Sequence, residues 1–130
     1  MSAFERGLEH FRAARYEQAR TELVAAVEQE PANPQAWRYL AAAHFSAGDF
    51  AGAEDPARRC AALTPGDPAV HLNLAIILRK LGAWDEARAS LDECLRLRPD
   101  YEAAQLEYGK HTQQRAAVWA EAPEFGPLSE

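Results

Sequence analysis

Histidines and cysteines are the side chains of this sequence best suited to bind a metal or to transfer a proton. The 130 residues include four histidines and two cysteines. No two histidines have the i, i+4 spacing of a helical zinc site, and no Cys-x2-Cys pair accompanies them. The interval from His10 to His44 is instead the same as the interval from Trp37 to His71. The spacing indicates an architectural role for the histidines and predicts no metal site and no cofactor.

Nucleophiles and phosphate-binding loops also lack the context that their chemistry needs. The glycines follow expected helices and not strands, so no loop is placed to cradle a phosphate. Ser46, Ser90 and Ser129 lie outside any nucleophile-elbow sequence. Acidic residues are numerous, but Glu54 and Arg58 have the i, i+4 spacing of an ion pair on a helix surface. We therefore predict no catalytic residue, and a protein that is not an enzyme.

The two thiols, Cys60 and Cys94, are separated by the same interval as His10 and His44. Ala26 occupies the same position one interval earlier, so the position holds small apolar residues. If each interval is one structural unit, the cysteines lie in neighbouring units stacked about 10 Å apart, which exceeds the reach of a disulfide. Both cysteines are predicted to be structural residues.

The elements that must position these side chains are short amphipathic helices. Residues 68–99 contain two of them, because apolar residues recur at three- and four-residue steps on both sides of a break at Gly82, and Pro99 ends the second. Asn33-Pro34 and Asp67-Pro68 are helix start signals, each a short polar cap followed by a proline in the first turn. The same reasoning predicts helices at 3–13, 16–29, 34–47 and 50–63 and a longer last helix at 101–120.

Two places disagree with the regular pattern. The turn Ala13-Ala14-Arg15 lacks the glycine that the later turns have at Gly48 and Gly82. Pro56 falls inside the helix expected at 50–63, and an interior proline clashes with the carbonyl four residues earlier. That residue is Gly52, which predicts a kink or a late start of the helix.

When the sequence is shifted against itself by the interval from His10 to His44, several classes of residue align at once. The shift superposes small residues (Gly7, Ala41, Ala75, Gly109), aromatic residues (Tyr16, Phe50, Trp84) and prolines (Pro31, Pro65, Pro99). Trp37, Leu40 and Ala41 also form a W-x2-L-[GA] element, whereas Ala3 and His71 stand at the tryptophan position of the other two units. From about residue 2 to residue 120, the chain resembles the tetratricopeptide repeat family in this interval and in these residues.

This resemblance implies an all-α fold, a right-handed α-solenoid of three helical hairpins plus a C-terminal capping helix. It implies one domain at 1–121, with repeats at about 1–33, 34–67 and 68–101 and the capping helix at 101–120. Pro123, Gly126 and Pro127 forbid further helix, so residues 122–130 are expected to form a flexible tail.

Composition narrows the classes of partner. The chain is 48% hydrophobic and 26% charged, as is ordinary for a soluble domain. Its net charge of −6 and pI near 5.2 argue against a nucleic-acid partner, which would need a basic surface. No apolar run is long enough for membrane insertion, and residues 1–12 do not form a signal sequence, so we expect a cytoplasmic protein.

In the family that this chain resembles, the first helix of each hairpin lines a concave groove that binds peptides. Arg12, Arg38, Arg79 and Lys80 carry positive charge on this face and Glu5 is its one acid, so we expect an apolar floor with a basic rim. Alternatively, Phe4, Leu8 and Phe11 pack the groove interior or a dimer interface. Carried over residue by residue, the expected peptide-binding groove consists of Phe4, Leu8, Phe11, Arg12, Arg38, Ala42, Phe45, Leu72, Asn73, Ile76, Arg79 and Lys80.

The sequence therefore predicts a protein-protein interaction module, an adaptor or scaffold that binds an apolar or acidic peptide of another protein. Family members that clamp the C-terminus of heat-shock chaperones use a lysine and an asparagine where this chain has Phe4 and Leu8, which makes that partner a poor match. Two alternatives remain open: a small chaperone for an export substrate, and a self-assembling scaffold. In the second, Phe125 and Leu128 of the tail enter the groove of another copy and form a weak homo-oligomer.

Overall fold

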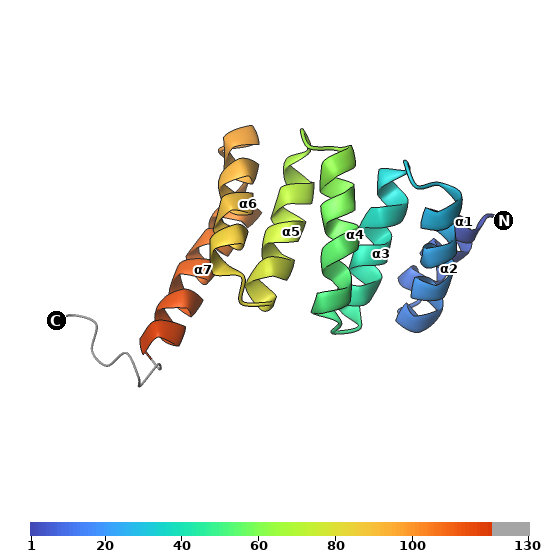
Figure 1. The fold of residues 1–130 in the computed structure, drawn as a ribbon, viewed down its shortest axis with the longest axis horizontal. Coiled ribbons are helices and arrows are strands. Elements are labelled where there is room, and N and C mark those ends of the chain that lie inside the picture. Colours follow the sequence, from blue (N-terminus) through green and yellow to red (C-terminus); the bar gives the residue numbers. More distant parts are fainter. Residues whose placement is uncertain (121–130) are drawn as a thin grey trace.

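The computed structural model of the protein describes the backbone of residues 1–120 and the side chains of residues 1–117. Within that part the regular structure is entirely helical, which confirms the predicted all-α solenoid of hairpins. The tail predicted for 122–130 lies outside the described residues. Figure 1 shows the helices in chain order along a row of hairpins, with α1 and α2 at one end and α6 and α7 at the other. The helices are α1 (Ala3–Arg12), α2 (Tyr16–Gln29), α3 (Pro34–Ser46), α4 (Phe50–Leu63), α5 (Pro68–Lys80), α6 (Trp84–Leu97) and α7 (Glu102–Ala120).

Local signals account for where the helices begin. The Asn33 side chain accepts a hydrogen bond from the backbone N–H of Gln35 at 3.0 Å, and Asp67 does the same for Ala69 at 3.0 Å. In front of α1, Ser2 and Glu5 form a reciprocal capping box. These bonds satisfy backbone donors that the first turn of a helix leaves unpaired. The helix boundaries predicted from the sequence agree with those of the structure to within one residue.

The turns inside the three hairpins share one backbone conformation. Gly48 and Gly82 have φ angles of +83° and +77°, and Ala14 occupies the equivalent position with a φ of +59°. An alanine in this left-handed region is strained because its Cβ approaches the following carbonyl oxygen. The first turn therefore keeps the geometry of the other two without their glycine.

One hydrogen bond recurs at each junction between hairpins, although the residue that donates it changes. Trp37 donates its indole N–H to the carbonyl of Pro31 at 2.7 Å. In the next repeat His71 Nε2 lies 2.7 Å from the carbonyl of Pro65, which can only accept, so this nitrogen carries a proton. The third bond runs from Gln105 Nε2 to the Pro99 carbonyl at 3.0 Å. Three unlike side chains thus perform the same task, and His71 has the architectural role that its spacing predicts.

The other histidines also make local contacts. His44 Nδ1 lies 3.0 Å from Asp49 Oδ2 at the turn between α3 and α4. His10 accepts from Arg15 Nε at 2.9 Å across the preceding turn. His111, which is buried, contacts the Trp84 carbonyl through Nε2 at 2.8 Å. Among the described residues no three His, Cys, Asp or Glu side chains are grouped as metal ligands would be.

Small residues allow close packing inside the hairpins. A Cβ added at Gly7 would lie 2.7 Å from Cγ of Leu23, which is completely buried in α2. The core continues along the row in three clusters, and Ala57 and Cys60 of α4 are among its buried residues. Cys60 and Cys94 are buried free thiols, as predicted, and desolvation raises the pKa of both.

The helix that contains Pro56 is continuous from Phe50 to Leu63, so the alternative of a late helix start is wrong. Asp49 caps this helix by accepting from the backbone N–H of Gly52 at 2.9 Å, and that bond is the largest cause of the lowered pKa of Asp49. A Cβ added at Gly52 would crowd the side chains of Asp49 and His44, which would have to shift to admit it.

Candidate functional site

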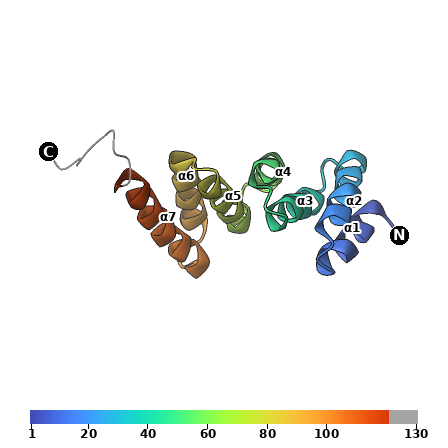
Figure 2. The ribbon, with the colours of Figure 1, turned by 90° about the horizontal axis from the view of Figure 1, so that it is seen from below.

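A cavity of about 330 Å³ opens between α3 and α5, with α4 behind it. Figure 2 shows α4 and α6 along one side of the row and α3 and α7 along the other. We call the cavity and its mouth the α3/α5 cavity. It is lined by Phe11, Arg38, Tyr39, Ala41, Ala42, Phe45, Ser46, Ala57, Cys60, Val70, Asn73, Ile76 and Ile77.

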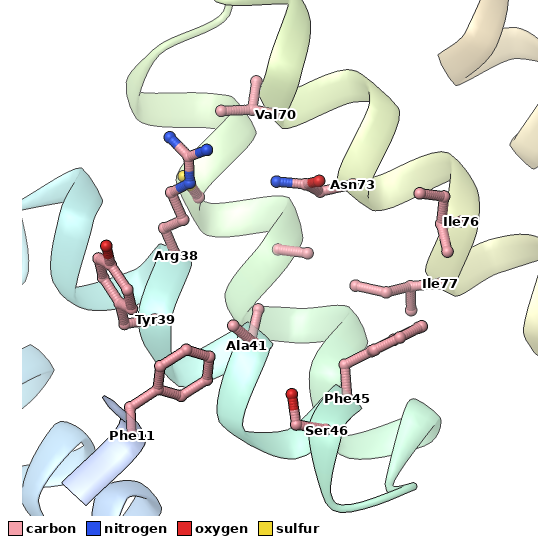
Figure 3. A pocket seen from close by; sticks show the side chains of 13 residues that line it. Phe11, Arg38, Tyr39, Ala41, Phe45, Ser46, Val70, Asn73, Ile76 and Ile77 are labelled. Atoms are coloured by element: carbon pink, nitrogen blue, oxygen red, sulfur yellow. The ribbon is translucent and has the colours of Figure 1, made fainter. Parts of the chain in front are cut away.

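Small side chains explain why this space is open. Ala41 and Ala42 of α3 and Ala57 of α4 line it, and a longer side chain at any of these positions would extend into it. Larger apolar residues form the walls, with Phe45 and Ile77 on one side in Figure 3. The cavity is therefore a mostly apolar depression.

Aromatic residues of α1 and α3 form the opposite wall. The rings of Phe11 and Tyr39 meet edge to face with their centroids 5.6 Å apart, and Phe4 contacts Tyr39 in the same way at 6.2 Å. Such pairs favour a fixed orientation of the rings. Phe4 and Phe11 also pack against the core cluster that contains Leu23 and Ala36, and Leu8 is half-buried on the same helix. These contacts agree with the alternative in which Phe4, Leu8 and Phe11 pack the interior of the groove. Of these three residues, Phe11 alone lines the cavity.

Two polar side chains stand at the mouth. Figure 3 shows the Asn73 amide of α5 pointing toward the side chain of Arg38 of α3. Arg38 is half-buried and Asn73 is exposed. Their nitrogen atoms can donate hydrogen bonds to a carboxylate or a backbone carbonyl that enters between the two helices.

Three of the four cations expected on this face differ from Arg58 on the second helix α4. Among the described residues, Arg12, Arg38 and Lys80 form no ion pair with an acid, and Lys80 lies 5.8 Å from the ring centroid of Phe50. By contrast, Arg58 contacts Glu54 at 2.9 Å and Glu86 at 2.7 Å. Arg12, Arg38 and Lys80 thus keep their charge available to an anion.

The one acid expected on this face, Glu5, is already hydrogen-bonded within its own helix cap. Glu5 accepts a hydrogen bond from the backbone N–H of Ser2 at 3.1 Å, and this bond is the largest cause of its lowered pKa. Glu5 remains an anion through its role in the capping box and does not pair with Arg38.

Two of the residues expected in the groove are buried. Arg79 is not on a basic rim: its side chain is 6% exposed and its Nε donates to Glu107 Oε2 at 3.0 Å. It also donates to the side chain of Gln114, so it fastens α7 to α5. Leu72 is buried in the C-terminal core cluster with Leu91 and Ala104. The capping helix covers both positions, and the accessible site is centred on α3.

The structure adds residues to the site that the groove pattern omits. Ala57 and Cys60 belong to α4, a second helix, yet both line the α3/α5 cavity. Their small size is visible in the sequence, where it indicates close helix packing. Ala42, Phe45 and Ile76 line the cavity as well, and so do Arg38 and Asn73.

These features define a class of protein: a solenoid of repeated helical hairpins with an apolar cavity on the face of its first helices. Two family models, each described as tetratricopeptide repeat, match residues 4–68 and 47–110. The chain belongs to the tetratricopeptide repeat family. This fold generally serves protein interaction and not catalysis. None of the helices in the described part is long and apolar enough to cross a membrane.

Similar proteins give the same fold. The mouse Superkiller complex protein 3 is 29% identical over 96 residues, which is 74% of this chain but 6% of that protein. The first repeat domain of Spaghetti (RPAP3), bound to the HSP90 peptide SRMEEVD, is 24% identical with a TM-score of 0.81 over 88% of this chain and 90% of that one. The second such domain of human RPAP3, in complex with the HSP70 peptide SGPTIEEVD, is 22% identical with a TM-score of 0.81 over 85% and 92%.

Proposed function

We propose that this protein is an adaptor or scaffold whose α3/α5 cavity binds a peptide segment of another protein through one large apolar side chain that lies beside a carboxylate. The observation that carries the proposal is the combination of an apolar cavity with an unpaired arginine at its mouth. The apolar cavity would bind the apolar side chain of the peptide, and Arg38 would bind the carboxylate beside it.

The cavity is large enough to hold one large apolar side chain. About 330 Å³ is at the lower end of the range of roughly 300–1,000 Å³ for ligand pockets. Full burial of a leucine, isoleucine or phenylalanine side chain contributes about 1.5–3 kcal/mol. Such an anchor would contact Phe45 and Ile77 and rest on Ala42.

The charge at the mouth selects the residue next to the anchor. Arg38 can donate two parallel hydrogen bonds to a carboxylate, and Asn73 faces it from α5. A lysine or arginine at the same place in a peptide would be repelled by Arg38 and by Lys80 along the same face. The overall charge of −6 would further repel a strongly acidic protein, so we expect the acidic residues of the peptide to be few and local.

The two RPAP3 domains offer support by analogy, since the peptides named for them combine apolar residues with glutamate and aspartate. The proposed recognition is not the same, because Phe4 and Leu8 hold no charge at the start of the groove. In the proposed recognition, Arg38 and the small residues of α3 and α4 make the contacts that distinguish one peptide from another.

A displayed library of synthetic peptides tests this function. The library varies one apolar residue and its two neighbours in an otherwise Gly/Ser-rich segment, and selected peptides are measured by fluorescence anisotropy. We expect enrichment of leucine, isoleucine or phenylalanine beside aspartate or glutamate. Ala42→Phe, which fills the cavity, and Arg38→Gln, which removes the charge, should each weaken binding at least about tenfold, or about 1.4 kcal/mol.

Arg96→Gln is the matched control, because Arg96 is an exposed arginine of α6 paired with Glu93. It should bind selected peptides as the unaltered protein does. Failure to enrich any apolar-acidic pattern, or equal binding by all three variants, would contradict the proposal.

A further inference from the structure

The outward face of α7 lacks the partner that the first helices of the other hairpins have. Gly109 follows Ala75 by the repeat interval, and it therefore holds the small-residue position where a first helix meets the second helix of its own hairpin. At the equivalent Gly7, an added Cβ would come within 2.7 Å of Leu23 of α2. At Gly109 it would meet nothing within 4 Å. Leu106, one turn earlier, is a large apolar side chain that is 68% exposed.

The described chain does not turn back to cover this face. In the hairpins the turn falls at Ala14, Gly48 and Gly82, and the next position at the same interval is Ala116. Ala116 lies inside α7, which continues to Ala120. The part of the chain that the structure describes therefore contains no second helix at the place where the repeat interval would put one after α7.

The opposite end of the row is closed in a different way. In the inner repeats Ala36 and Val70 are both buried, and Ala36 lies in one core cluster with Leu23 of the preceding hairpin. Ser2 holds the equivalent position in the first repeat, and Glu9 holds the position of the buried Ala43. This polar end does not offer an apolar face to α7 of another copy, so head-to-tail stacking is disfavoured.

We propose that the exposed face of α7 binds α7 of a second copy of this chain, antiparallel, about a two-fold axis at Leu106. In this arrangement the two Leu106 side chains meet, and residues equally distant from Leu106 on either side face each other. Glu102 then lies opposite Lys110 of the second copy, and Ala103 opposite its Gly109. All four of these residues are exposed in the single chain.

Charge and shape both favour this register. An antiparallel pair about the axis brings two Glu-Lys pairs into contact and no like charges. Small residues at 103 and 109 allow the helices to approach closely. Lys110 already contacts Glu107 of its own chain at 3.5 Å, so it can interact with both acids.

The interface is small. One helix from each copy provides a single large apolar residue, and a standard interface buries about 1,600 Å² in total. Exposed ion pairs add little to affinity. The dimer is therefore weak, and it forms at high protein concentration.

Sedimentation equilibrium of the full chain over a range of concentrations tests the proposal. We expect a monomer-dimer equilibrium with substantial dimer near about 1 mM. Leu106→Glu should leave only monomer, and its circular dichroism should be unchanged because Leu106 has few contacts within its own chain. Val24→Glu, at an exposed valine of α2, is the control and should dimerise normally.

A charge exchange tests the register itself. Glu102→Lys and Lys110→Glu should each weaken the dimer, because each places like charges opposite one another. The double variant should restore the affinity, because it exchanges the charges of both pairs. A wild-type chain that remains monomeric, a dimer unaffected by Leu106→Glu, or a double variant weaker than both single ones would overturn the proposal.

Discussion

Replacement of Arg79 should detach α7 from the rest of the protein. The Arg79 and Glu107 side chains are 6% and 11% exposed, and Nε lies 3.0 Å from Oε2. Arg79→Met would leave the Glu107 carboxylate buried without its guanidinium, and breaking a buried pair in this way costs about 3–5 kcal/mol. Lys110, at 3.5 Å from the other oxygen of Glu107, compensates in part because it is exposed and can move closer. We therefore expect a loss of about 2–4 kcal/mol in the free energy of unfolding.

This loss is a large fraction of the roughly 5–15 kcal/mol that stabilises a typical domain. Urea denaturation followed by circular dichroism measures it, and amide hydrogen exchange should show that α7 loses protection first. Arg58→Met is the matched control: Arg58 pairs with Glu54 and Glu86 on the surface, so its loss should cost no more than about 1 kcal/mol.

The double variant Arg79→Met with Glu107→Leu separates the cost of an isolated charge from the value of the pair. Replacing both members with apolar residues should recover most of the stability, because no buried charge then remains. If Arg79→Met costs no more than Arg58→Met, the buried pair does not fasten α7 and the reasoning fails.

Two predictions concern small residues. Ala14→Gly should raise the free energy of unfolding by about 1 kcal/mol in thermal or urea denaturation, because it relieves the left-handed strain at φ +59°, and unchanged or lower stability would show that the turn is not strained. Gly7→Ala should destabilise by about 1–3 kcal/mol because its Cβ would collide with the buried Leu23. Gly109→Ala, measured in dilute solution, should stabilise by up to about 1 kcal/mol because nothing obstructs its Cβ, and equal effects at both glycines would refute the packing argument.

Short-range signals in the sequence account for the local features of this protein. Asn33 and Asp67 cap helices whichever residues pack around them, and Gly48 and Gly82 end helices because they adopt positive φ. Repetition at a constant interval indicated that His71 replaces Trp37. Each of these signals depends on a few neighbouring residues or on the repeat, so each could be read without the fold.

Which helix faces are covered depends on contacts between residues that are distant in the sequence. Periodicity assigns Leu72 and Arg79 to a first helix, but α7 buries both, since its Ala104 lies in the core cluster of Leu72 and its Glu107 accepts from Arg79. Similarly, the small size of Ala57 in the sequence indicates close helix packing, yet Ala57 lines the α3/α5 cavity. The helical pattern states which side chains share a face, whereas the neighbour that covers that face depends on contacts between residues distant in the chain. The site is therefore smaller and more centred on α3 than the pattern predicts.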